Sequence, residues 1–72
     1  MPVAAASAET LARIGCNISI DGSQYATITL ESLARILTAS GRHLTVRQAD
    51  RLAVSSLETL ARIAGPLLTV EI

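Results

Sequence analysis

Hydrophobic and polar positions follow two different periods along this chain, and the two periods succeed one another three times. In each cycle apolar residues first recur every three or four positions, which is typical of a helix with one buried face. A short segment then alternates apolar and polar residues, which is typical of a strand with one buried face. The helical segments share Glu-(Thr/Ser)-Leu-Ala-Arg-Ile, at 9–14, 31–36 and 58–63. The strands are expected at 17–21, 43–47 and 67–71.

Each helical hexapeptide has one polar side and one apolar side. Its Glu and Arg are four residues apart, the spacing of a surface ion pair on a helix, worth about 0.3–0.5 kcal/mol. Its Leu and Ile form an apolar stripe that we expect to face the core. These apolar residues are Leu11, Ile14, Leu33, Ile36, Leu60 and Ile63. A glycine follows each helical segment and is suited to end it in the left-handed conformation: Gly15, Gly41 and Gly65.

The alternating segments predict a parallel sheet with matched rows of side chains. If the units stack in chain order, Arg47 lies between Asp21 and Glu71 on neighbouring strands, a row of alternating charge. Thr45 then lies between Ser19 and Thr69 in a row of hydroxyl groups. A strand, a crossover and a parallel strand form a right-handed turn in nearly all proteins. The repeat therefore predicts an α/β protein made of helix–strand units, with a short, mainly parallel sheet covered on one face by helices.

The unit boundaries follow from the same alignment. One domain is expected over residues 1–72, with residues 1–7 flexible and units at about 8–21, 30–47 and 56–72. The connectors between units are expected to contribute inward apolar residues: Ile28 in the first, and Leu52 or Val54 in the second. One alternative remains open for the first connector. Because Asp-Gly is a strong turn signal, residues 18–21 and 25–29 are also compatible with a β-hairpin.

Composition limits the chemistry that is available. The chain has 72 residues, one Cys, one His, one aromatic residue and a formal net charge of zero. A domain this small is marginally stable, and with a single Cys no internal disulfide supports it, which leaves oligomerisation as a means of stabilisation. Zero net charge disfavours a nucleic-acid partner. We expect no metal or other cofactor, no small-molecule substrate, no membrane segment and a cytoplasmic location.

The segments 44–49 and 66–70, together with leucines at 52, 57 and 60, resemble a leucine-rich repeat. The most similar subtype reads Leu-x-Leu-x-x-Cys/Ala, a short loop, and then Leu-x-x-Leu-Ala in a helix. The resemblance covers residues 9–72, with one complete unit. It implies a binding scaffold whose strand face grips partner proteins.

Residues 43–63 also resemble the helix-turn-helix of excisionase-type regulators, which begins with Leu-Thr-Val-Arg-Gln-Ala. This resemblance implies a small DNA-binding regulator with a helix-turn-helix at 45–64. Its phosphate-binding and groove-facing residues would be Arg47, Arg51, Ser55, Ser56, Thr59 and Arg62. The neutral charge argues against DNA binding. So does the repeat, because the hexapeptide at 58–63 has two copies outside the proposed motif.

No catalytic constellation accompanies the repeat, so an enzyme is not expected. His43 stands without a second metal-ligating residue nearby and is interpreted as a surface or strand-edge histidine, and Cys16 as a buried structural thiol. The favoured function is a protein-interaction module that self-associates, or binds another protein, through exposed strand edges. The residues expected to meet the partner are Asp21, Thr45, Arg47, Thr69 and Glu71.

Overall fold

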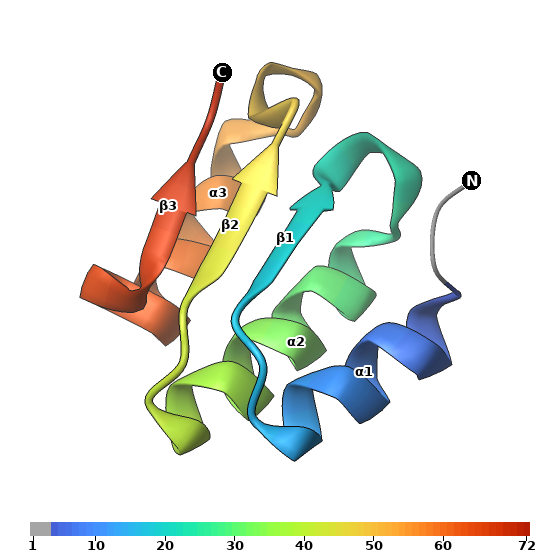
Figure 1. The fold of residues 1–72 in the computed structure, drawn as a ribbon. Coiled ribbons are helices and arrows are strands. Elements are labelled where there is room, and N and C mark those ends of the chain that lie inside the picture. Colours follow the sequence, from blue (N-terminus) through green and yellow to red (C-terminus); the bar gives the residue numbers. More distant parts are fainter. Residues whose placement is uncertain (1–3) are drawn as a thin grey trace.

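Helices and strands alternate along the whole described chain (Figure 1). The structure is a computed structural model and describes residues 4–72. Within that range the α-helices and strands are α1 Ala5–Ile14, β1 Ile18–Asp21, α2 Thr27–Ser40, β2 Leu44–Arg47, α3 Val54–Ala64 and β3 Leu68–Val70. Short 3₁₀ turns join them: η1 Gly22–Gln24, η2 Ala49–Arg51 and η3 Gly65–Leu67. The three predicted helix–strand pairs are therefore present.

The strands form one parallel sheet in the order β1-β2-β3, and the helices lie on one face of it (Figure 1). The predicted register is confirmed: Asp21 pairs with Arg47, and Thr45 lies between Ser19 and Thr69. Glu71 lies just beyond β3, yet its N–H donates to the Val46 carbonyl at 2.9 Å. Its carbonyl accepts from the Ala49 N–H, also at 2.9 Å.

The first connector is a crossover, and the hairpin alternative is wrong. Residues 22–24 form η1, and α2 begins at Thr27, so no strand follows the Asp-Gly turn. The Asp21 side chain accepts from the Ser23 N–H and starts this turn in the manner of an N-cap. The helix-turn-helix placement at 45–64 is wrong as well. Residues 44–47 are in the middle strand of the sheet, where that motif needs its first helix.

The core lies between the sheet and the helices. Its largest fully buried side chains are Leu30, Leu33, Leu37, Leu44, Val46 and Leu60. Leu52 in the second connector packs against this cluster, as predicted. Ile28 and Val54 do not: they are 73% and 70% exposed, because each sits in the first turn of a helix on its outer side.

The helix ends follow the predicted glycine pattern in two of the three units. Gly15 and Gly41 have φ of 113° and 72°, and both end their helices in the left-handed conformation. Gly65 also has a positive φ, but its ψ of −124° lies outside that region, and Pro66 continues the chain into η3. The first helix begins at Ala5, three residues before the predicted start of its unit. Of the segment 1–7 predicted to be flexible, residues 1–3 lie outside the described residues.

Candidate interaction site

A groove of about 630 Å³ runs along the outer edge of β1. Its lining comes mainly from α1, β1 and the segment that follows β1, with one residue from the end of β2. The lining includes Leu11, Ile18, Ile20, Gln24, Tyr25 and, from β2, Arg47. Among the strands of residues 4–72, β1 has a neighbour on one side only. A groove of this kind, with an apolar wall beside a strand edge, can accept an extended segment of another chain by strand addition.

The backbone of β1 is oriented for such an addition. The Ile18 N–H donates to the His43 carbonyl at 3.0 Å, on the side of β2. Successive residues of a strand direct their backbone N–H and C=O groups to opposite sides. Ser19 therefore presents its N–H and C=O toward the groove. These are the groups that a further parallel strand would bind.

Equivalent residues of the three units can be compared directly, and the comparison shows that side chains at the β1 end of the sheet are less buried. Leu33 and Leu60, at the same hexapeptide position in α2 and α3, are fully buried, whereas Leu11 in α1 is 41% exposed. Ile36 and Ile63 are half-buried and pack against the core, whereas Ile14 is 73% exposed. Because the chemistry is the same in each unit, the difference comes from the missing neighbour on the outer side of α1 and β1.

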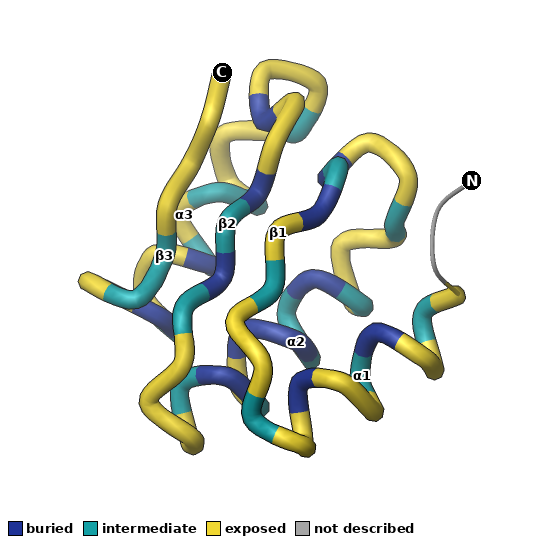
Figure 2. Tube along the Cα trace, viewed as in Figure 1, coloured by how far each residue is buried: buried dark blue, intermediate teal, exposed yellow. Residues whose placement is uncertain are grey.

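At the opposite end of the sheet, residues of α3 and β3 are more exposed than their equivalents in the first two units. Ala12 and Ala34 have no exposed surface, whereas the equivalent Ala61 on α3 is exposed. In the strands, Ile20 and Val46 are 6% and 0% exposed, whereas Val70 in β3 is 38% exposed. Figure 2 shows the same gradient, with buried residues concentrated in the middle of the molecule. We call Leu11, Ile14 and Ser19 the leading surface, and Ala61, Glu58 and Val70 the trailing surface.

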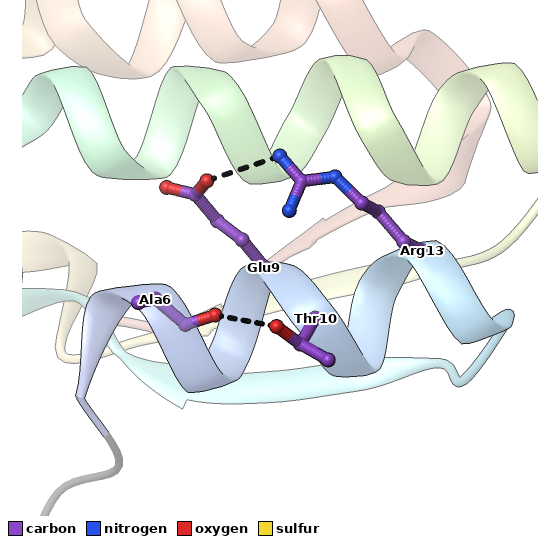
Figure 3. A network of polar contacts seen from close by, with 4 residues as sticks. All are labelled: Ala6, Glu9, Thr10 and Arg13. Atoms are coloured by element: carbon purple, nitrogen blue, oxygen red, sulfur yellow. Dashed lines mark hydrogen bonds and ion pairs between the residues drawn. The ribbon is translucent and has the colours of Figure 1, made fainter.

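The predicted Glu–Arg pairs are confirmed in all three helices, and the pair on α3 is the most exposed. Glu9–Arg13, Glu31–Arg35 and Glu58–Arg62 are separated by 3.5, 3.6 and 3.8 Å. Figure 3 shows the pair of α1 on the side of that helix that faces α2. The glutamate side chains of α1 and α2 are 27% and 25% exposed, but that of α3 is 59% exposed. The pair on α3 thus lies on a helix face that no following helix covers.

The predicted charged row runs across the solvent face of the sheet, opposite the helices. Its members meet in register, but within residues 4–72 the only ion pairs are those of the three helices. Asp21 instead accepts the Ser23 N–H at 2.9 Å and the Ser23 hydroxyl at 2.6 Å. In the hydroxyl row, Thr69 Oγ1 is hydrogen-bonded to His43 Nε2. The hydrogen bonds described for Asp21 and Thr69 therefore join these two residues to side chains and backbone outside the two rows.

The hydroxyl and N–H of Ser23 lower the pKa of Asp21 below its ordinary value of 3.8, and the positive charges of Arg47 and Arg51 lower it further. We expect Ser23→Ala to raise this pKa part of the way back, because the backbone N–H remains. A depressed folded pKa gives stability that is present above the unfolded pKa and is lost as pH falls through the folded value. Carboxyl ¹³C shifts followed from pH 6 downward would measure both midpoints. Equal midpoints in the two proteins would contradict this role of the hydroxyl.

Two other candidate groups need correction. Cys16 is exposed and does not form part of the core, because it follows the Gly15 cap at the outer end of α1. The residues assigned to DNA contacts do not lie on one pair of helices, because Arg47 ends β2 and Arg51 is in η2. On α3, Arg62 pairs with Glu58, and the Thr59 hydroxyl donates to the Ser55 carbonyl at 3.0 Å. Ser56 is half-buried.

The groove was not identified from the sequence, although the exposed Leu11 that lines it belongs to the repeat.

Two absences hold for the part of the chain that the structure describes. In residues 4–72 no three His, Cys, Asp or Glu side chains gather closely enough to hold a metal ion. None of the helices in this range combines the length and the apolar character needed to cross a bilayer.

The chain matches no protein-family model, and comparison found no similar curated protein and no similar solved structure. The resemblance to leucine-rich repeats stays a prediction. Function has to be inferred from the two end surfaces and the groove.

Proposed function

We propose that this protein is a non-enzymatic interaction module that self-associates through the free edges of its three-stranded sheet. The observation that carries the proposal is the groove beside β1, with Leu11 41% exposed in a position that is fully buried in the other two units. At the other edge, β3 leaves Val70 38% exposed. Two aliphatic edges on one small sheet, neither covered, favour pairing with another strand.

The apolar surface at these edges is large for so small a chain. Leu11, Ile14, Val70 and Ile72 are all exposed large hydrophobic residues, at 41%, 73%, 38% and 93%. Burying apolar surface contributes about 25 cal/mol per Å². A contact between edges would also supply partners for the outward backbone groups of both strands. Association is therefore favoured by the same two forces that hold β1, β2 and β3 together.

The test is the mass of the protein as a function of concentration. Light scattering or sedimentation velocity from about 1 μM to 1 mM should show a rising mean mass for the wild-type chain. Leu11→Lys should weaken association at least tenfold, because it places a charge in the groove. Ile28→Lys is the matched control: Ile28 is equally apolar and 73% exposed, but it lies in the first turn of α2. A wild-type chain that stays at 7.5 kDa throughout would refute the proposal.

A further inference from the structure

We infer that the partner of the groove is β3 of a second copy, and that the copies stack head to tail, with α3 and β3 of one against α1 and β1 of the next. This inference rests on the proposed self-association and adds the partner segment, its direction and its register. In such a stack the leading surface of one copy contacts the trailing surface of another. The contact repeats an interface that the chain already makes twice, between its first and second units and between its second and third.

The helices show which faces would meet. Within the chain, the Thr38 hydroxyl on α2 donates to the Ile63 carbonyl on α3 at 3.4 Å, so the Ile63 region of α3 faces α2. Ile14 is the equivalent of Ile63 and faces outward from α1. The α3 of another copy would cover Ile14 as α2 covers Ile63. The same contact would bury Ala61. Its equivalents Ala12 and Ala34 are fully buried in α1 and α2, and each of these helices packs against the helix that follows it.

The outer edges of β3 and β1 direct their backbone groups so that β3 of one copy can pair with β1 of the next. The Glu71 N–H donates to Val46 on the side of β2, so Val70, one residue earlier, directs its backbone groups outward. Ser19 does so at the edge of β1. Extending the observed register by one strand places Leu68, Thr69 and Val70 beside Ile18, Ser19 and Ile20 of the next copy. The hydrogen-bond ladder of the sheet then continues from one copy to the next without a change of register. The rows of apolar and hydroxyl side chains continue in the same way.

The position of the helices relative to the strands disfavours both symmetric pairings, β1 with β1 and β3 with β3. α1 flanks the outer edge of β1 and forms one wall of the groove there (Figure 1). Antiparallel pairing of two β1 edges would bring both copies of α1 into the same space. Pairing of two β3 edges would leave a gap beneath Val70, because within residues 4–72 no helix packs on the outer side of β3. Only the head-to-tail contact supplies one helix for each added strand, and such a contact builds an open chain of copies rather than a closed dimer.

One feature opposes the contact and limits its strength. The extended register brings Glu71 of one copy beside Asp21 of the next, two carboxylates on the solvent face. The hydrogen bonds from Ser23, and after them the positive charges of Arg47 and Arg51, already lower the pKa of Asp21, and the two arginines partly offset its charge. The contact between copies is therefore weaker than the contacts between units within one chain, where Asp21 adjoins Arg47. Assembly is expected to be reversible and concentration-dependent.

A mixing experiment tests the direction of stacking. Ile14→Lys blocks the leading surface and Ala61→Lys blocks the trailing surface, and both residues are exposed in the single chain, so neither change disturbs the core. Each variant alone should be monomeric at concentrations where the wild type associates. An equimolar mixture has one intact surface of each kind. It should form a 1:1 dimer of about 15 kDa, twice the 7.5 kDa of one chain, and nothing larger.

The other outcomes have distinct meanings. If Ile14→Lys alone still dimerises, the β3 edges pair symmetrically and head-to-tail stacking is wrong. If the wild type associates but the mixture stays monomeric, the stacking is wrong while the proposed self-association stands. A monomeric wild type refutes both. Circular dichroism checks that each variant is folded. If one is not, Leu11→Lys replaces Ile14→Lys on the leading surface, and Ala61→Glu replaces Ala61→Lys on the trailing surface. Ile28→Lys should assemble like the wild type, and its failure to do so would overturn the assignment of the contact to the two ends.

Discussion

Replacing Leu33 with alanine is expected to lower the free energy of unfolding by about 2–5 kcal/mol, because a fully buried leucine leaves a cavity when it is truncated. At about 0.05–0.15 kcal/mol per residue, a chain of this length has a total stability of about 4–11 kcal/mol. The substitution should therefore remove a large share of that stability and populate the unfolded state near room temperature. Urea denaturation followed by circular dichroism would measure the change.

The repeat provides matched controls for this measurement. Leu11, Leu33 and Leu60 hold the same hexapeptide position, but only Leu11 is exposed, at 41%. Leu60→Ala should cost about as much as Leu33→Ala, and Leu11→Ala about 1 kcal/mol or less in dilute protein, since much of its surface already meets water. At concentrations where the chain associates, the cost of Leu11→Ala should rise, because the groove is then filled. Equal losses at all three positions in the monomer would contradict the difference in burial.

The fold was predictable because the three units repeat both periods of hydrophobic residues. Repetition places equivalent apolar residues side by side, so parallel stacking buries those that face a neighbouring unit, and the register follows from the alternation within each strand. Asp21 beside Arg47, and Thr45 between Ser19 and Thr69, are direct results. The repeat did not distinguish a crossover from a hairpin at residues 22–29, because the Asp-Gly turn signal is compatible with either.

The repeat gave a wrong prediction of burial for residues in the first and last units. Sequence identity implies equal burial, but burial depends on neighbours, and within residues 4–72 the first and last units each have a neighbouring unit on one side only. Leu11 and Ile14 were predicted to face the core, and they are 41% and 73% exposed. Ala8 and Ala12 are the buried residues of α1. The groove follows from this difference, so it could be found only after the spatial order of the units was known.

Alanine at Gly22 is the second substitution with a large expected effect. Gly22 is buried at the end of β1, and an added Cβ would lie 2.7 Å from Val46 Cγ1 and 3.2 Å from Leu52 Cδ1. The backbone carbonyl of Arg47 would be 3.3 Å away and has little freedom to move. Overpacking of this kind costs about 1–3 kcal/mol. The sequence marks Gly22 as a turn residue, but its φ is not positive, so close packing of η1 against β2 is what requires glycine.

A double-mutant cycle separates overpacking from loss of backbone freedom. Val46→Ala removes the methyl group nearest the new Cβ, so Gly22→Ala should cost less in that background, with a coupling of about 0.5–3 kcal/mol. Gly41→Ala is the contrasting control, because nothing lies within 4 Å of its added Cβ and only its φ of 72° opposes the change. Its cost, about 1–2 kcal/mol for left-handed backbone, should be unaffected by Val46→Ala. Strict additivity of Gly22→Ala with Val46→Ala would show that the contact between η1 and β2 is not what excludes a side chain at Gly22.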